Sequence, residues 1–152
     1  MKHVLKPLAV LLCSAALCLS AARSEVADAA QRGDRASLSR LLQQRANVNE
    51  TQVDGSTALH WAVYRGDDEM ADLLIRSGAR VRTATREGIT PMYLASLYGN
   101  ARIIEQLLKA GADPNERGLN SETMLMLAAR NGTPGAVRVL IAAKADVNAS
   151  ER

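Results

Sequence analysis

Apolar positions in the middle of the chain fall into pairs of short helical stripes. Leu59, Ala62 and Val63 follow the i, i+3, i+4 spacing that places side chains on one face of a helix. A second stripe begins after Gly66 and consists of Met70, Ala71, Leu73, Leu74 and Ile75. A glycine at such a junction favours a helix end, because its backbone enters the left-handed region without a Cβ clash. The pattern predicts two helices joined by a tight turn.

The residues before each stripe are typical helix N-caps. Thr57 precedes the first stripe and Asp67 precedes the second, and a side-chain oxygen at this position accepts from the free N–H groups of the first turn. Asp68 and Glu69 then fall in that turn, where the helix dipole favours acids. The same interpretation applies to Thr90 before Pro91, to Asn100, and to Thr133 before Pro134.

The helix pair recurs with a period of 33 residues. Four columns keep one residue type, namely Gly33, Gly66, Gly99 and Gly132; Leu41, Leu74, Leu107 and Leu140; Ala29, Ala62, Ala95 and Ala128; and Ala46, Ala79, Ala112 and Ala145. A fixed period of this length indicates units that bury their apolar faces against one another. We therefore expect an all-α solenoid of stacked helix pairs with extended, hairpin-like fingers, in units of about 26–50, 51–83, 84–116 and 117–149.

The unit openings carry a family signature. The segment Gly55-Ser56-Thr57-Ala58-Leu59-His60-Trp61-Ala62 resembles the ankyrin repeat motif, and Gly88 to Ala95 matches it with Tyr93 in the place of His60. Gly111-Ala112-Asp113-Pro114-Asn115 is similar to the closing motif of the same family. The resemblance covers about residues 26–152. It implies an ankyrin-repeat solenoid in which His60 joins neighbouring finger and helix backbones through hydrogen bonds.

The outer units depart from this pattern. Arg45 and Lys144 stand where the middle units have Gly78 and Gly111, and Ser121 replaces a finger glycine in the fourth unit. A non-glycine residue in a left-handed conformation costs about 1 kcal/mol. We therefore expect the fourth unit to be looser than the second and third. The first unit lacks the Thr-x-Leu-His opening and is expected to be the N-terminal cap.

The last predicted helix carries an apolar stripe that no later helix covers. Its members are Val137, Val139, Leu140 and Ile141. A solenoid needs a polar terminal cap to stay soluble. We therefore expect that the array continues, that a partner covers this face, or that the chain self-associates through its C-terminal unit.

The first residues have the order of a signal peptide. The chain begins with the positive residues Lys2, His3 and Lys6. An apolar run from Leu8 to Leu19 follows, and the small residues Ser20, Ala21 and Ala22 come next. We expect cleavage after Ala22 or Ser24 and a periplasmic or secreted location. The apolar run is shorter than the roughly 20 residues that span a bilayer, so we expect no stable membrane insertion after cleavage. An uncleaved anchor and lipidation of Cys18 stay open as alternatives.

Composition narrows the classes of function. Removal of residues 1–22 takes away Lys2 and Lys6 but no acid, which lowers the net charge from +3 to +1. A nucleic-acid binder would show a concentrated basic stripe, whereas here arginines and acids are interspersed, so no nucleic-acid partner is expected. Both cysteines, Cys13 and Cys18, lie in the presumed signal peptide. The mature chain then has no disulfide or thiolate metal site.

The sequence offers little for catalysis. His60 is the one histidine outside the signal peptide, and the resemblance gives it a structural role. The run Asp67-Asp68-Glu69 would suit a cation, but helix capping accounts for it. Trp61 is interpreted as a packing residue. We therefore predict that the chain is not an enzyme and has no cofactor and no metal site.

Protein binding is the positive expectation. In the ankyrin family, finger tips and the exposed ends of the first helices form a concave face that contacts other proteins. The partner-binding residues that this resemblance implies are Asp54, Ser56, Tyr64, Arg65, Arg86, Glu87, Ile89, Leu97, Tyr98, Asn120, Arg130 and Asn131, with Val53, Leu119 and Glu122 at equivalent positions. Tyr64, Tyr98, Arg65 and Ile89 are preferred because aromatic residues and arginine are common interface anchors.

Two functional hypotheses remain from the sequence. The first is an exported scaffold or adaptor that binds a protein partner of unknown identity through the concave face. The alternative is an N-terminal regulatory ankyrin array of a longer protein that carries another activity. Fold alone does not decide between them, since one fold hosts many functions.

Overall fold

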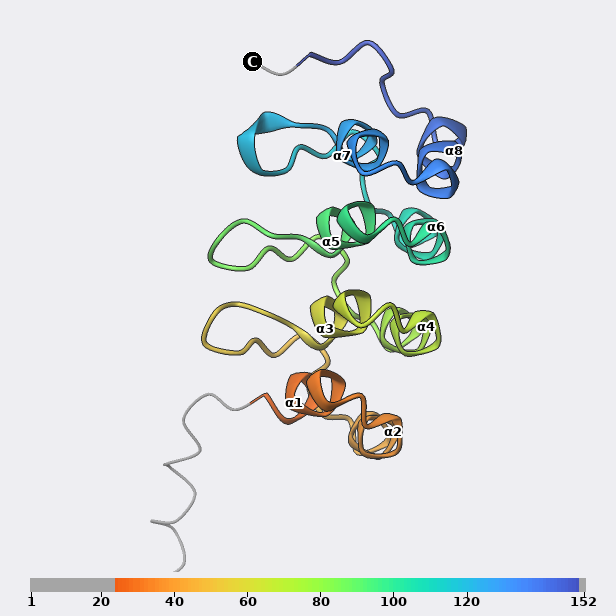
Figure 1. The fold of residues 1–152 in the computed structure, drawn as a ribbon. Helices are drawn as coiled ribbons and strands as arrows, with labels where there is room; N and C mark the ends of the chain where they lie inside the picture. Colours follow the sequence, from red (N-terminus) through yellow and green to blue (C-terminus); the bar gives the residue numbers. More distant parts are fainter. Residues whose placement is uncertain (1–23, 151–152) are drawn as a thin grey trace, which may run out of the picture.

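The computed structural model describes residues 24–150, so the predicted signal peptide, residues 1–22, lies outside the described part of the chain. Helices in this part form consecutive antiparallel pairs (Figure 1). They are α1 (Glu25–Arg32), α2 (Arg35–Gln43), α3 (Ala58–Tyr64), α4 (Asp68–Arg76), α5 (Pro91–Tyr98), α6 (Ala101–Lys109), α7 (Met124–Arg130) and α8 (Pro134–Ala142). A short 3-10 turn, η1 (Leu119–Ser121), precedes α7. The all-α repeat solenoid is confirmed.

Most helices begin at the caps that the sequence predicts. Asp67 accepts from the backbone N–H of Met70, and Asn100 accepts from that of Ile103. Thr90 caps α5 directly before Pro91. Thr133 is different, because its hydroxyl donates to the carbonyl of Ala128 at 2.9 Å and makes no cap hydrogen bond. The expectation of a side-chain cap at Thr133 is therefore wrong.

The helices stack in two rows, as Figure 1 shows. In one row α1 packs on α3, α3 on α5 and α5 on α7, while in the other α4 packs on α6 and α6 on α8. Small side chains make the first row compact: Ala29, Ala62, Ala95 and Ala128 are fully buried. Larger side chains, including Leu74, Leu107 and Leu140, fill the space between the rows. The invariant alanine and leucine columns of the sequence thus lie in the core or pack against it, whereas the glycine column lies at the turns within each pair, where Gly66 and Gly132 are exposed.

Left-handed backbone positions occur where the sequence predicts them. Arg45, Lys144 and Ser121 have φ values of 60°, 63° and 61°. Asn120, beside Ser121, also has a φ of 61°, which the sequence did not indicate. The fourth finger therefore contains two consecutive strained residues where the second finger has Gly55, with a φ of 86°.

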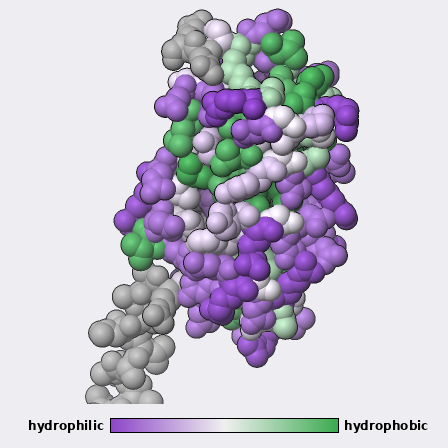
Figure 2. Space-filling model, viewed as in Figure 1, coloured by the Kyte–Doolittle hydropathy of each residue, from purple (hydrophilic) through white to green (hydrophobic). Residues whose placement is uncertain are grey.

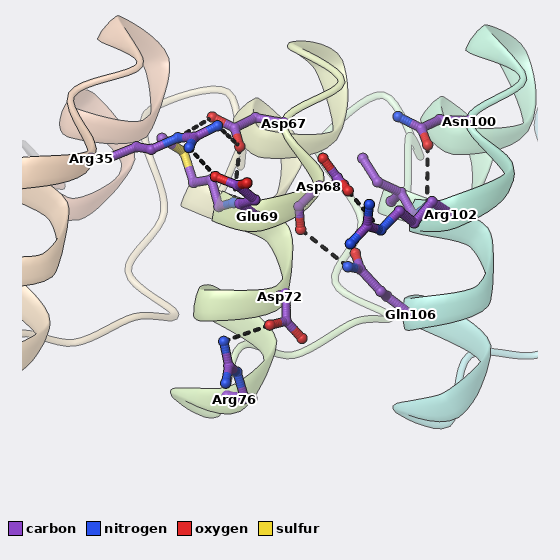
Figure 3. A network of polar contacts seen from close by, with 11 residues as sticks. Arg35, Asp67, Asp68, Glu69, Asp72, Arg76, Asn100, Arg102 and Gln106 are labelled. Carbon is purple, nitrogen blue, oxygen red and sulfur yellow. Dashed lines mark hydrogen bonds and ion pairs between the residues drawn. The ribbon is translucent and has the colours of Figure 1, made fainter.

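Charged side chains link the second helices of successive units (Figure 3). Arg35 pairs with Asp67 at 2.7 Å and also with Glu69, and Arg102 pairs with Asp68 at 2.7 Å. These acids lie at the start of α4, so the ion pairs join its first turn to both neighbouring helices. Within residues 24–150 no helix has the length and apolar character needed to cross a bilayer.

Candidate functional site

The fingers between helix pairs are closed by the same short turn. The backbone N–H of Gln52 donates to the carbonyl of Ser56 at 2.8 Å, and that of Thr85 donates to Ile89 at 2.9 Å. The second finger joins the third because the Arg86 N–H donates to the Asp54 carbonyl at 2.9 Å. The fingers project from the first helices to the same side of the stack (Figure 1), and this hydrogen bond joins the second and third into a shelf.

His60 holds this shelf to the helices. The backbone N–H of Thr57 donates to its Nδ1 at 3.1 Å, so Nε2 carries the proton and donates to the carbonyl of Ile89 in the next finger at 3.1 Å. The ring is buried, and burial lowers its pKa below the ordinary value of 6.5. Both nitrogens are engaged by backbone or cap groups, which confirms the structural role expected for this residue.

Three aromatic side chains form a ladder across two units. The rings of Trp61 and Tyr64 meet edge to face with centroids 5.8 Å apart, and Tyr64 meets Tyr98 in the same way at 5.7 Å. Edge-to-face contacts at these distances are favourable. Tyr64 and Tyr98 nevertheless remain 56% and 53% exposed. We call Trp61, Tyr64 and Tyr98 the aromatic ladder.

The ladder borders a hollow between the fingers and the first helices. This hollow, the Tyr64 hollow, has a volume of about 310 Å³ and is lined by Asp54, Ser56, His60, Trp61, Tyr64, Thr85, Glu87, Ile89 and Leu94. A wider, more open depression of about 970 Å³ adjoins it and shares Asp54, Trp61 and Glu87. The two together form one continuous concave area of the surface.

The structure places most of the predicted partner-binding residues on the surface. The exposed ones are Asp54, Tyr64, Arg65, Arg86, Glu87, Tyr98, Asn120, Arg130 and Asn131, and Ile89 and Leu97 are half-buried. Ser56 is buried, because its backbone N–H and hydroxyl both donate to the Asp54 carboxylate, at 2.9 and 2.8 Å. These two bonds lower the pKa of Asp54, the backbone bond most, so Asp54 stays ionised. The expectation that Ser56 is available at the finger tip is wrong.

The Tyr64 hollow unites only part of the predicted set. Asp54, Ser56, Tyr64, Glu87 and Ile89 line it, and Tyr98 touches Tyr64 at its border. The fourth-unit residues serve contacts within the stack instead. Arg130 pairs with Glu122 at 2.8 Å, and the Asn131 amide donates to the Leu97 carbonyl at 3.0 Å. Glu122, expected at the surface, is 3% exposed.

Arg65, one of the preferred anchors, also works within the stack. Its guanidinium donates to the Gln31 carbonyl at 3.3 Å. The same group covers Gly33, where a Cβ would lie 2.6 Å from it. Arg65 therefore packs over the turn between α1 and α2, and only the remainder of its side chain faces solvent.

Several members of this surface were not predicted as partner-binding residues, namely the lining residues His60, Trp61, Thr85 and Leu94 and the supporting residue Gln52. Trp61 is half-buried, and its indole N–H donates to the side-chain oxygen of Gln52 at 2.7 Å. The Gln52 amide in turn donates to Asp28 at 2.6 Å and to Gln31 at 3.1 Å. Trp61 is thus a packing residue, as expected, and also a wall of the hollow. Its position three residues before Tyr64 on one helix was the available signal.

Comparison with protein-family models gives two matches. A model described as ankyrin repeats in three copies matches residues 26–118. A model described as an ankyrin repeat matches residues 120–149. No curated protein matches the chain. Among the α-helices described for residues 24–150, the matched segments contain α2 to α8 in full and all of α1 except Glu25.

Proposed function

Because the chain belongs to the ankyrin repeat family, we propose that it is an exported scaffold or adaptor that binds a partner protein through the face formed by its fingers and first helices. Ankyrin repeats generally mediate protein–protein interaction and are typically non-catalytic. The observation that carries the proposal is the aromatic ladder, which leaves Tyr64 and Tyr98 more than half exposed on a rigid scaffold.

Exposed aromatic side chains of this kind are favoured at the centre of interfaces. Tyrosine buries a large area on binding and loses little conformational entropy, since two torsions define its side chain. Here the rotamer of Tyr64 is held in advance by its contacts with Trp61 and Tyr98. Preorganisation of this type raises affinity because less freedom is lost on binding.

A capture experiment tests this role. The native exported protein is compared with a Tyr64→Ala, Tyr98→Ala variant, and bound proteins are identified by mass spectrometry. We expect the variant to lose a specific partner, with binding weakened at least about tenfold. A Glu105→Ala, Lys109→Ala variant is the matched control, because it truncates two exposed side chains of α6 outside the ladder. If both variants capture every partner equally well, the ladder is not the interface.

The position of Ser24 distinguishes between the two cleavage sites expected for an exported chain. This residue caps α1 by accepting from the Ala27 N–H at 3.1 Å, and its hydroxyl donates to the Glu50 carbonyl at the same distance. Cleavage after Ala22 would keep this cap, whereas cleavage after Ser24 would remove it. We therefore propose cleavage after Ala22. N-terminal sequencing of the secreted or periplasmic protein should then give Arg23 as the first residue.

Self-association is a second candidate function, favoured by the fourth unit. Ile141 and Val147 are 49% and 64% exposed. Figure 2 shows hydrophobic surface gathered over the upper units, whereas the region over α1 and α2 is mainly hydrophilic. Analytical ultracentrifugation tests it: an Ile141→Lys, Val147→Lys variant should be monomeric at concentrations where the unchanged chain dimerises, and a wild-type chain that stays monomeric would contradict it.

A further inference from the structure

We propose that the Tyr64 hollow receives a cationic side chain, arginine or lysine, from the partner protein. This inference rests on the proposed function and specifies the chemistry that the partner presents. It follows from the aromatic walls of the hollow, from the two carboxylates at its rim, and from the absence of a lysine or arginine among its lining residues.

The walls suit a cation. Trp61 and Tyr64 both line the hollow, and a cation over such a ring, within about 6 Å of its centre, is attracted by the electrons of the ring face. The indole is fixed by the hydrogen bond to Gln52, and Gln52 is fixed in turn by Asp28. The walls are thus set before a ligand arrives, and little ordering is needed on binding.

The rim supplies opposite charge. Asp54 and Glu87 stand on adjacent fingers and are both exposed. Each Asp54 oxygen accepts one hydrogen bond from Ser56, and a carboxylate oxygen has a second lone pair for a guanidinium or ammonium donor. No ion pair to Asp54 or Glu87 forms within residues 24–150. The negative charges of Asp54 and Glu87 are therefore able to pair with a cation of the partner.

Other positive and neutral groups do not cancel this charge inside the hollow. His60 at its base is uncharged near neutral pH, since burial lowers its pKa and its Nδ1 accepts a hydrogen bond. Arg32 and Arg86 border the adjoining wider depression, which Asp54 and Glu87 border as well, but neither arginine forms an ion pair with either carboxylate within residues 24–150. These arginines discourage a strongly basic segment from lying across the whole surface, so one inserted cation fits better than a long basic tract.

The same features argue against other ligands. Two carboxylates repel phosphate groups, which disfavours a nucleic acid or a phosphorylated segment at this place. Among residues 24–150 no group of three or more His, Cys, Asp or Glu side chains could hold a metal ion. A volume of about 310 Å³ with one open side accommodates a long, flexible side chain and its charged end.

Trp61 makes the proposal directly measurable, because it is the one tryptophan of the chain. Its fluorescence is followed while the full chain is titrated with a three-arginine peptide, a three-lysine peptide, or a three-citrulline peptide that keeps the shape of arginine without its charge. We expect a saturable change with the cationic peptides and binding at least about tenfold weaker with citrulline. Equal responses to all three would overturn the proposal.

Charge-neutral variants separate this site from general attraction. Asp54→Asn with Glu87→Gln should weaken binding of the arginine peptide by about fivefold. The matched control, Glu105→Gln with Asp146→Asn, removes the same charge elsewhere on the exposed surface and should bind as the unchanged chain does. Circular dichroism of all three proteins verifies the fold. A loss of equal size in both variants would assign the binding to net charge and reject the hollow.

The capture experiment distinguishes this inference from the proposed function. If Tyr64→Ala with Tyr98→Ala abolishes capture but Asp54→Asn with Glu87→Gln does not, the surface binds a protein and the cation proposal fails. If both variants abolish capture, the surface binds a protein partner and the Tyr64 hollow receives a cationic side chain from it. If neither has an effect, the surface itself is wrongly assigned.

Discussion

Single residues in left-handed conformations mark the outer units of the stack. Lys144 has a φ of 63° two residues after the end of α8, where the equivalent Gly111 has a φ of 95° two residues after the end of α6. The difference matters because a Cβ in this region meets the following carbonyl oxygen, at a cost of about 1–2 kcal/mol. Since a Cβ at Gly111 would have nothing within 4 Å, the cost at this position comes from the backbone and not from crowding.

Lys144→Gly should therefore stabilise the protein. We expect an increase of about 0.5–1 kcal/mol in the free energy of unfolding, because relief of the strain exceeds the extra chain entropy of glycine. Urea denaturation measures the change. The reciprocal variant Gly111→Lys should destabilise by a similar amount, and a stabilising effect there would show that the strain argument is incorrect.

Burial of His60 makes stability depend on pH. The pKa of the folded state lies below 6.5, whereas the unfolded chain titrates near the ordinary value. Well above pH 6.5 the His60 ring is neutral in both the folded and the unfolded state, and its contribution to the free energy of unfolding is fully present. As the pH falls below 6.5 toward the folded pKa, the unfolded state takes up the proton first and stability is lost.

Urea unfolding between pH 8 and 5 checks this expectation. The free energy of unfolding should fall across the lower part of that range, and His60→Gln should reduce the slope while lowering stability at neutral pH through the lost backbone bonds. Asp54 is the nearby acid that opposes the shift, so Asp54→Asn should steepen the loss. An unchanged slope in the glutamine variant would show that other groups cause it.

At the level of elements, helix starts were the most predictable feature. Asp67 and Asn100 cap their helices as expected. The Asp67 carboxylate has only acceptor oxygens, and the Asn100 side chain turns its acceptor oxygen toward the free N–H groups of the first turn. Thr133 could not be predicted, since a hydroxyl both donates and accepts. It donates to the Ala128 carbonyl in the last turn of α7, which also accepts from the Thr133 backbone N–H.

Asp67 combines a cap with an ion pair, and two substitutions separate them. Asp67→Ala should cost about 1–2 kcal/mol, because the Met70 N–H loses its acceptor at the start of α4. Asp67→Asn keeps an acceptor and loses only the attraction to Arg35, so it should cost less than about 1 kcal/mol. Thermal unfolding compares them, with Asp72→Ala as control, because it breaks only the ion pair between Asp72 and Arg76 within α4. Equal losses from both would mean that the ion pair, not the cap, matters.

At the level of the whole molecule, the 33-residue repeat predicted where the candidate surface lies, but it did not predict the contacts among the side chains of that surface. Asp54 and Glu87 occupy equivalent positions on successive fingers, so the register alone placed both at the tips. Tyr64 and Tyr98 are 34 residues apart, one more than the repeat period, and the period therefore did not predict that their rings touch. The burial of Ser56 depends on its bonds to Asp54, which no apolar pattern encodes.

Hydrogen exchange should reveal a gradient along the stack. Asn120, Ser121 and Lys144, all non-glycine residues with positive φ, lie in the fourth unit. We expect amides of α7 and α8 to exchange faster than those of α3 to α6, because local opening of a strained unit needs less free energy. Mass spectrometry of peptides from each unit measures this. Equal protection of the fourth and the middle units would contradict the prediction.

The stacking of each helix pair on the next has a consequence for how this protein can change over generations. Corresponding helices begin 33 residues apart, and the main helix contacts run between adjacent pairs. An in-frame genetic duplication or loss of one whole period therefore inserts or deletes a finger without disturbing the apolar seams on either side. New fingers arise as copies and can diverge freely at their tips, so binding specificity can evolve by recombination while the fold is conserved.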